Sequence, residues 1–175
     1  DRAVAPSFLE VAEPDDRLIV VNSFSKSWAM TGWRLGWLTH PEAVGSYIAN
    51  LVEFNTSGTP AFLQRAGVTA VRDGEALVAS MVERCRQGRE AIGRCLAALP
   101  RVRYTPPEAA FYAFFAVDGM TNSLDFAKRL VHEAKVGLAP GTAFGPQGEG
   151  FLRLCFARAP ETLEAAADRL ARALR

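Results

Sequence analysis

The middle of the sequence carries an apolar stripe that no short element can accommodate. Its members recur at alternating steps of four and three residues, the spacing that places side chains on one face of an α-helix. Gly74 precedes the stripe, and Pro100, which cannot continue a helix, follows it. The spacing predicts a helix of roughly seven turns, long enough to join two lobes. The stripe consists of Val78, Val82, Cys85, Arg89, Ile92, Leu96 and Leu99, and only Arg89 departs from the pattern.

The composition is that of an ordinary globular protein. Of 175 residues, 49% are hydrophobic and 22% are charged, which argues against disorder and allows one sizeable core or two small lobes. The net charge of +1 provides no electrostatic footprint for nucleic acid or for an acidic membrane surface. Uncharged runs are too short and too often broken by Gly and Pro to span a bilayer, and no basic-then-apolar leader opens the chain.

The cysteine content argues against both a disulfide framework and a zinc site. The chain has three cysteines without a CxxC pair, and only His40 and His132 could accompany them as ligands. We therefore expect Cys85, Cys95 and Cys155 to be free thiols, and we expect the protein to be cytoplasmic.

The residues before the long helix predict strands followed by helices. Residues 18–21 (LIVV) form a short apolar run between turn-like segments, which favours a buried strand of a parallel or mixed sheet. A second strand is predicted at residues 34–38, and helices at residues 41–51 and 61–71 flank a loop at residues 55–60. The first residues show no clear starting element, so we expect the chain to begin partway through a larger architecture.

The residues after the long helix predict a small α+β lobe. Strands, helices and turns alternate there, and a Gly/Pro-rich loop covers residues 138–150. Ser123 is predicted to cap a helix, and Pro160 is predicted to open the last one. Strands are predicted at residues 102–104, 111–115 and 151–156. The predicted organisation is therefore residues 1–73, a connecting helix at residues 74–100, and a lobe at residues 101–175.

Chemistry is concentrated directly after the first strand, in Ser23-Phe24-Ser25-Lys26. The four residues formally match S-x-x-K, the serine–lysine signature of β-lactamases and penicillin-binding proteins. That interpretation also needs S-D-N and K-T-G elements, and neither tripeptide occurs in the sequence. Because two of the four positions are free, the match is a weak one.

A second interpretation makes Lys26 the reactive group. A lysine that is partly desolvated beside another cation loses its charge more readily and can form a Schiff base with a carbonyl. The planar guanidinium of Arg34 suits bidentate binding of a phosphate, and Ser23 and Ser25 add hydroxyl groups on the same turn. These groups match an aldehyde cofactor that carries a phosphate, which is pyridoxal 5'-phosphate.

The same residues resemble a known family. The segment SFSKSWAMTGWRLG (residues 23–36) closely resembles the lysine motif of class I/II aminotransferases, the fold-type I pyridoxal-phosphate enzymes. Residues 107–112 resemble the family's P-x-G-A-F-Y segment, with Ala109 where the family usually has Gly. Residues 136–145 resemble its V-x-x-x-PG-x-x-FG loop, and residues 150–157 resemble its substrate-arginine strand.

The resemblance implies a role for each matching residue. Lys26 is implied as the Schiff-base lysine and as the base that moves a proton between the substrate Cα and the cofactor. Ser23 and Arg34 are implied as ligands of the cofactor phosphate, with Ser25 beside them. Gly32 and Gly36 are implied to allow close backbone packing around the arginine.

Arg153 is implied to bind the α-carboxylate of the substrate. The guanidinium would hold the amino acid so that its Cα–H bond is oriented for reaction. From its own strand alone, Arg153 is equally well explained as a structural ion-pair partner, and only the resemblance favours the substrate role.

The resemblance also implies an α/β fold and an activity. The chain would be the C-terminal part of the large pyridoxal-phosphate domain, with a mixed and mostly parallel sheet, followed by a small α+β domain. The implied activity moves an amino group between an amino acid and a 2-oxo acid, and the parent protein would be a homodimer. Upstream residues that the family uses, including an aspartate at the pyridine nitrogen, have no counterpart here, and Asp1 is expected to lie past that aspartate. The chain therefore resembles a truncated C-terminal portion, and whether it is active or inactive alone stays open at this point.

Other functions remain open at this point. A C–S β-lyase or a decarboxylase of the same fold would share Lys26, Arg34 and Arg153. The effector-binding half of a transcription regulator built on this fold, or a truncated remnant without activity, would also match.

Overall fold

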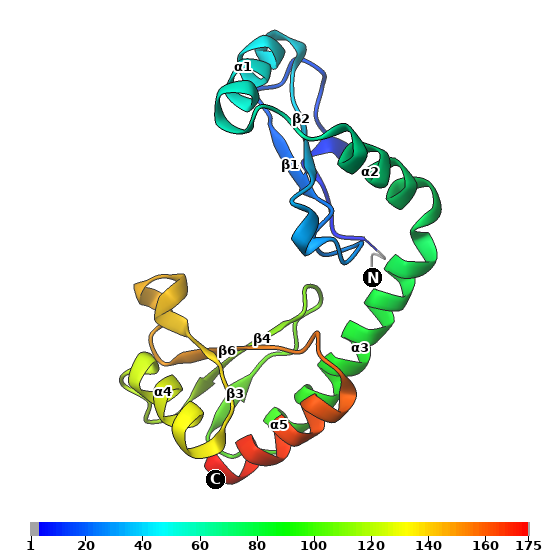
Figure 1. Cartoon of the computed structure of the whole chain (residues 1–175). Helices are drawn as coiled ribbons and strands as arrows, with labels where there is room; N and C mark the ends of the chain where they lie inside the picture. Colours follow the sequence, from blue (N-terminus) through cyan, green and yellow to red (C-terminus); the bar gives the residue numbers. More distant parts are fainter. Residues whose placement is uncertain (1–3, 175) are drawn as a thin grey trace. The chain divides into compact units, whose positions relative to one another are not determined.

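The computed structural model of the chain describes residues 4–174 (Figure 1). The chain divides between Met81 and Val82 into two compact units, here called the N-terminal unit and the C-terminal unit. The boundary falls inside helix α3 (Glu75–Ala97), the long helix that the apolar stripe predicts. The helix ends three residues before Pro100, and Arg89 lies half-buried on it because its guanidinium donates to the backbone O of Pro107. The three-part division at residues 73 and 100 stays a prediction, and Asp1 lies outside the described residues.

The strands of the N-terminal unit form an antiparallel pair. Strand β1 (Val20–Ser23) pairs with β2 (Gly36–Thr39), with Ser23 opposite Gly36. Within the part of the chain that the structure describes, all strand pairings are antiparallel, so the mostly parallel sheet is not seen there. The predicted strand at residues 34–38 begins too early, because Arg34 adopts the left-handed conformation at φ 51° after the 3₁₀ turn η2 (Thr31–Trp33).

Two helices follow β2, and their bounds correct the prediction. Helix α1 (Gly45–Thr56) begins later than Pro41, since a 3₁₀ turn, η3 (Glu42–Val44), comes between them. The helix also continues past Leu51, so the predicted loop is shorter. Its C-cap is Ser57, which adopts the left-handed conformation and whose N–H donates to Glu53 O. Helix α2 (Ala61–Asp73) agrees with its prediction. The chain start, predicted without an element, holds the 3₁₀ turn η1 (Phe8–Glu10).

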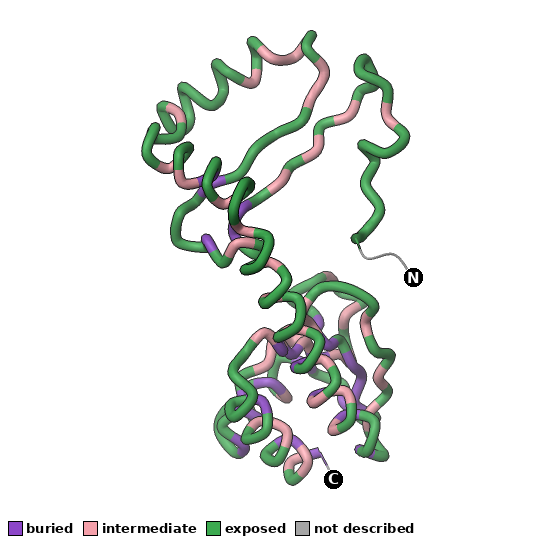
Figure 2. Tube along the Cα trace, turned by 90° about the vertical axis from the view of Figure 1, so that its right-hand side faces the viewer, coloured by how far each residue is buried: buried purple, intermediate pink, exposed green. Residues whose placement is uncertain are grey.

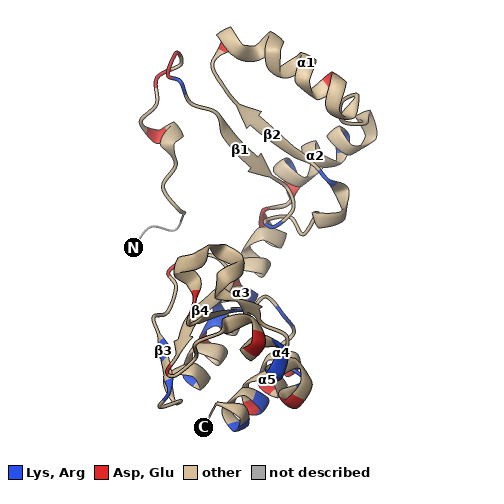
Figure 3. Ribbon diagram, turned by 90° about the vertical axis from the view of Figure 1, so that its left-hand side faces the viewer, with Lys and Arg blue, Asp and Glu red and all other residues tan. Residues whose placement is uncertain are grey.

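The N-terminal unit has a small core. Phe24, Met30 and Leu35 are buried together, and Trp28 packs against them with two alanines of α2. Figure 2 shows few buried positions in this unit and many in the C-terminal unit. Large apolar side chains stay exposed, among them Val21 at 74%, Tyr47 at 70% and Phe54 at 91%. Figure 3 shows β1 and β2 without charged residues.

The C-terminal unit is a two-layer α+β structure, as predicted for the residues after the long helix. Its antiparallel sheet has the strand order β3-β4-β6-β5. Helices α4 (Ser123–Ala134) and α5 (Pro160–Ala173) complete the unit with the end of α3. The segment predicted as a loop contains a short strand and the 3₁₀ turns η4 (Gly141–Phe144) and η5 (Pro146–Gly148). The strands are β3 (Val102–Tyr104), β4 (Tyr112–Val117), β5 (Ala139–Pro140) and β6 (Phe151–Cys155).

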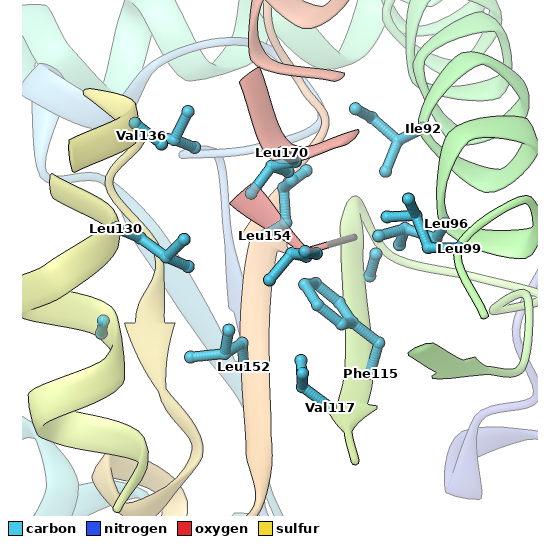
Figure 4. Close-up of a cluster of buried hydrophobic side chains, with 14 of the residues drawn as sticks. Ile92, Leu96, Leu99, Phe115, Val117, Leu130, Val136, Leu152, Leu154 and Leu170 are labelled. Carbon is cyan, nitrogen blue, oxygen red and sulfur yellow. The ribbon is translucent and has the colours of Figure 1, made fainter. Parts of the chain in front are cut away.

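One face of this sheet makes the main core (Figure 4). Phe115 of β4 and Leu152 of β6 are fully buried there against side chains of all three helices. Alternation along the strands places Phe114 and Arg153, a cross-strand pair, on the opposite face. The helix residues of the core include Ile92, Leu96, Leu130, Leu163 and Leu170.

Helix α4 begins differently from the prediction. Asn122, not Ser123, is the N-cap, because the Asn122 side chain accepts from the N–H of Asp125. Ser123 is fully buried, and its N–H donates to the carboxylate of Glu149 at 2.7 Å. The N–H of Gly150 donates to the same carboxylate at 2.8 Å. These hydrogen bonds, that of Gly150 first, hold the pKa of Glu149 below its usual value.

Candidate functional site

Lys26 lies on the turn that follows β1. The turn closes through the N–H of Ala29, which donates to Lys26 O at 3.3 Å, and the N–H of Met30, which donates to Phe24 O at 3.4 Å. Ala29 takes a left-handed conformation at φ 53°. The side chain of Lys26 is exposed. Lys26 therefore lies, with an exposed side chain, on a turn after β1 that its backbone hydrogen bonds define.

Aromatic packing holds this turn in place. The buried ring of Phe24 lies 5.0 Å from the ring of Trp28 and 5.1 Å from that of Trp37. The N–H of Phe24 also donates to Leu35 O at 3.0 Å, which extends the hairpin by one bond beyond β1. Trp28 and Trp37, whose own rings lie 6.4 Å apart, thus pack around Phe24. Trp33 is exposed on η2.

Ser23, Ser25 and Arg34 come together beside the turn. The Ser23 hydroxyl accepts from the N–H of Ser25 at 3.1 Å. Arg34 Nη1 lies 3.4 Å from Ser25 Oγ and donates to Thr31 O at 3.0 Å. Ser25 is buried, whereas Arg34 is exposed. Arg34, in its left-handed backbone conformation, thus contacts the hydroxyl of Ser25, the residue before Lys26.

The two glycines of this segment differ in what surrounds them. A Cβ at Gly36 would lie 2.5 Å from the backbone O of Asn22, so the close approach of β1 and β2 requires glycine there. A Cβ at Gly32 would meet nothing within 4 Å among the described residues. The predicted close packing is therefore confirmed for Gly36 and wrong, within this part of the chain, for Gly32.

Arg153 lies in the other unit, on β6. It is half-buried, and its guanidinium carbon lies 4.1 Å from the centre of the Tyr112 ring and 4.3 Å from that of Phe144. Across the described chain, no carboxylate forms an ion pair with Arg153. The sequence did not indicate either ring as a partner of the arginine, although the F-Y and F-G pairs of the family motifs contain them.

The predicted site residues thus form two groups. Lys26, Ser23, Ser25 and Arg34 are neighbours in the N-terminal unit, and Arg153 belongs to the C-terminal unit.

All three cysteines are free, as predicted. Burial raises the pKa of the Cys85 and Cys95 thiols, which leaves them poor nucleophiles. None of the helices within residues 4–174 is long and apolar enough to cross a membrane.

The chain belongs to the aminotransferases of class I and II, whose sequence pattern matches residues 3–170. The resemblance noted in the lysine motif is confirmed by this match. The family depends on pyridoxal phosphate.

Individual relatives agree with this assignment. An aspartate aminotransferase of Pyrococcus horikoshii is 35% identical over 162 residues, which are 91% of this chain and 41% of that protein. Aromatic-amino-acid aminotransferase 2 of Thermococcus litoralis is 38% identical over 165 residues, 91% of this chain and 42% of that protein. The crystal structure of aspartate aminotransferase from Thermotoga maritima superposes with a TM-score of 0.83 at 36% identity, covering 99% of this chain and 44% of that one. The chain spans about two fifths of the length of these relatives.

Proposed function

We propose that the protein to which this chain belongs is a pyridoxal-phosphate-dependent aminotransferase that moves an amino group between an amino acid and a 2-oxo acid. One observation carries the proposal: Lys26 lies on the turn after β1, next to Ser25 in the chain, and the Ser25 hydroxyl contacts the guanidinium of Arg34. Arg34 Nη1 lies 3.4 Å from Ser25 Oγ and, among residues 4–174, Arg34 forms no ion pair with a carboxylate. An arginine held by neutral groups keeps its charge for an anion.

This donor set fits the cofactor. Arg34 with Ser23 and Ser25 would hold the phosphate, since guanidinium and hydroxyl groups are its natural hydrogen-bond donors. Lys26 would attach covalently through its amine. When bound, pyridoxal phosphate supplies an aldehyde that condenses with amines and a ring that stabilises negative charge on the substrate Cα.

The residues of the chain then have separate tasks. The amine of Lys26 would also move a proton at the substrate Cα. Arg153 would bind the α-carboxylate and orient the Cα–H bond. Its lack of an ion-pair partner among residues 4–174 supports that role, because a committed ion pair would compete with the substrate.

The remaining features of the parent protein are part of the same proposal. We expect a mostly parallel sheet that β1 and β2 help to complete, a homodimer, and a cytoplasmic location. The exposed apolar surface of the N-terminal unit supports the larger sheet, since apolar surface left in water is unfavourable and further strands would cover it. Relatives named for aspartate and for aromatic amino acids match about equally well, so the proposal extends to amino acids and 2-oxo acids as a class.

The test uses protein expressed from the native reading frame. Aspartate, phenylalanine and cysteine are offered with 2-oxoglutarate, and glutamate formation is measured with Lys26→Ala as the matched inactive variant. Glutamate formation that Lys26→Ala abolishes is the expected result. Sulfide and pyruvate from cysteine, or carbon dioxide from aspartate, without glutamate would point to a lyase or a decarboxylase instead. A winged-helix segment encoded upstream together with no turnover would indicate a regulator.

A further inference from the structure

The outer face of the C-terminal sheet carries a connected group of aromatic side chains around Arg153. Tyr112 on β4 and Phe144 on η4 each place a ring about the same distance from the guanidinium carbon, 4.1 and 4.3 Å. The two rings come from segments far apart in the sequence, so the contact depends on the tertiary fold. The surroundings of the Arg153 guanidinium are therefore formed by tertiary contacts of β6 with β4 and η4.

Other arginines of this unit are engaged differently. Arg103 lies on the same sheet and pairs with the carboxylate of Asp118 at 3.0 Å. Arg101 donates to the backbone O of Asp118, and Arg89 donates to that of Pro107. The guanidinium of Arg153 contacts two rings and, within the described part of the chain, forms neither an ion pair nor a side-chain hydrogen bond. Ring faces attract a guanidinium without occupying its N–H donors, which point outward in its plane.

A second set of rings supports Phe144. Phe114, which lies directly opposite Arg153 in the β4–β6 register, contacts Phe144 edge-on with centroids 6.1 Å apart. Phe151 stacks on Phe114 at 4.9 Å with an interplanar angle of 3°. Phe114 and Phe144 remain 40% and 50% exposed, so burial of their own apolar surface explains only part of this arrangement. The contact of Phe114 with Phe144, and of Phe144 with the guanidinium of Arg153, explains the rest.

We propose that Tyr112 and Phe144 are positioning residues that hold the side chain of Arg153 in place while leaving its donors unpaired for a carboxylate. The proposal rests on the proposed function, in which Arg153 binds the substrate carboxylate. A long arginine side chain loses conformational freedom when it binds a ligand, and the two rings remove part of that freedom beforehand. Tyr112 acts here through its ring, since the cation contact needs no hydroxyl.

The test observes the arginine itself, in the 175-residue chain labelled with ¹⁵N. The Nε–H signal of Arg153 is assigned as the one that Arg153→Lys removes. Two rings near the guanidinium predict a signal displaced by ring currents, and Tyr112→Leu and Phe144→Leu should each move it toward the position of a free arginine. Tyr112→Phe, which keeps the ring, should leave it in place. Phe126→Leu removes a ring that carries another guanidinium, that of Arg129 at 4.5 Å, and serves as the matched control.

Binding is measured on the same samples by titrating 3-phenylpropanoate, with 3-phenylpropanamide as the uncharged control ligand. Each leucine variant at Tyr112 or Phe144 should weaken carboxylate binding about three- to tenfold, and Tyr112→Phe and Phe126→Leu should not. An unshifted Arg153 signal in the wild-type chain overturns the proposal. Shifted signals with unchanged affinity in the leucine variants overturn the positioning role. A shifted signal with no carboxylate binding in any protein instead contradicts the proposed substrate role of Arg153.

Discussion

Replacing Gly36 with alanine tests how the hairpin positions Lys26 and Arg34. The added methyl would lie 2.5 Å from the backbone O of Asn22, and that atom belongs to the opposite strand. A backbone atom cannot move aside as the end of a flexible side chain can. The strands must therefore separate, and the N–H of Phe24 would lose its bond to Leu35 O, now 3.0 Å long.

The expected cost follows from these two effects. Forcing an extra methyl into a closely packed place costs about 1–3 kcal/mol, and losing one backbone hydrogen bond costs about 1 kcal/mol. We expect Gly36→Ala to destabilise the N-terminal unit by about 2–4 kcal/mol. Gly32→Ala, in the same segment, meets nothing within 4 Å and should change stability by less than about 0.5 kcal/mol.

Urea unfolding followed by tryptophan fluorescence measures this difference. The three tryptophans of the chain, Trp28, Trp33 and Trp37, all belong to the N-terminal unit, so the signal reports on that unit alone. Gly36→Ala should unfold at clearly lower urea than the wild-type chain, and Gly32→Ala should coincide with the wild type. Equal midpoints for the two variants would refute the assignment of the close contact to Gly36.

Further predictions concern the C-terminal unit and use urea unfolding followed by circular dichroism. Tyr104→Phe should leave stability unchanged or raise it by up to about 1 kcal/mol, because the hydroxyl is buried without a partner in the described chain; a loss above that size would contradict this. In helix α3, Gly88→Ala should destabilise, since its methyl would lie too close to the backbone O of Phe156, whereas Gly93→Ala should stabilise by about 0.5–1 kcal/mol. Glu149→Gln should destabilise at neutral pH. Because hydrogen bonds lower the folded pKa of Glu149, their stabilisation is present above the usual pKa of about 4.5 and is lost as pH falls through the folded value, so the two proteins should converge in acid and not in base.

Elements with a clear periodicity could be predicted from the sequence. Helix α3 and strand β6 follow from apolar residues in the sequence. Ile92 and Leu96 of the helix stripe and Leu152 and Leu154 of the strand are buried, although Val82 of the stripe is 64% exposed. Pro160 correctly marks the start of α5. Such features are local, so one stretch of sequence contains all the information they need.

Features that depend on the third dimension could not be predicted. The antiparallel pairing of β1 with β2 depends on how the connection reverses, and the left-handed conformation of Arg34 has no composition signal because the residue is not glycine. Asn122 outcompetes Ser123 as the cap because Ser123 is buried against Glu149, a residue distant in sequence.

The candidate site shows the same division. The resemblance of residues 23–36 to the lysine motif predicts Lys26, Ser23 and Arg34 without a structure, because the motif is one continuous stretch of sequence. The ring contacts of Arg153 join β6 to β4 and η4, and no linear pattern reports them.

The central claim is that Lys26 is the covalent attachment point for pyridoxal phosphate. The chain is mixed with pyridoxal phosphate, reduced with borohydride, digested and mapped by mass spectrometry. It has only two other lysines, Lys128 and Lys135, both on or directly after α4, and these serve as internal controls. The account predicts a reduced pyridoxyl adduct on the peptide that contains Lys26 and little on the other two. No adduct, or equal labelling of all three lysines, would contradict it.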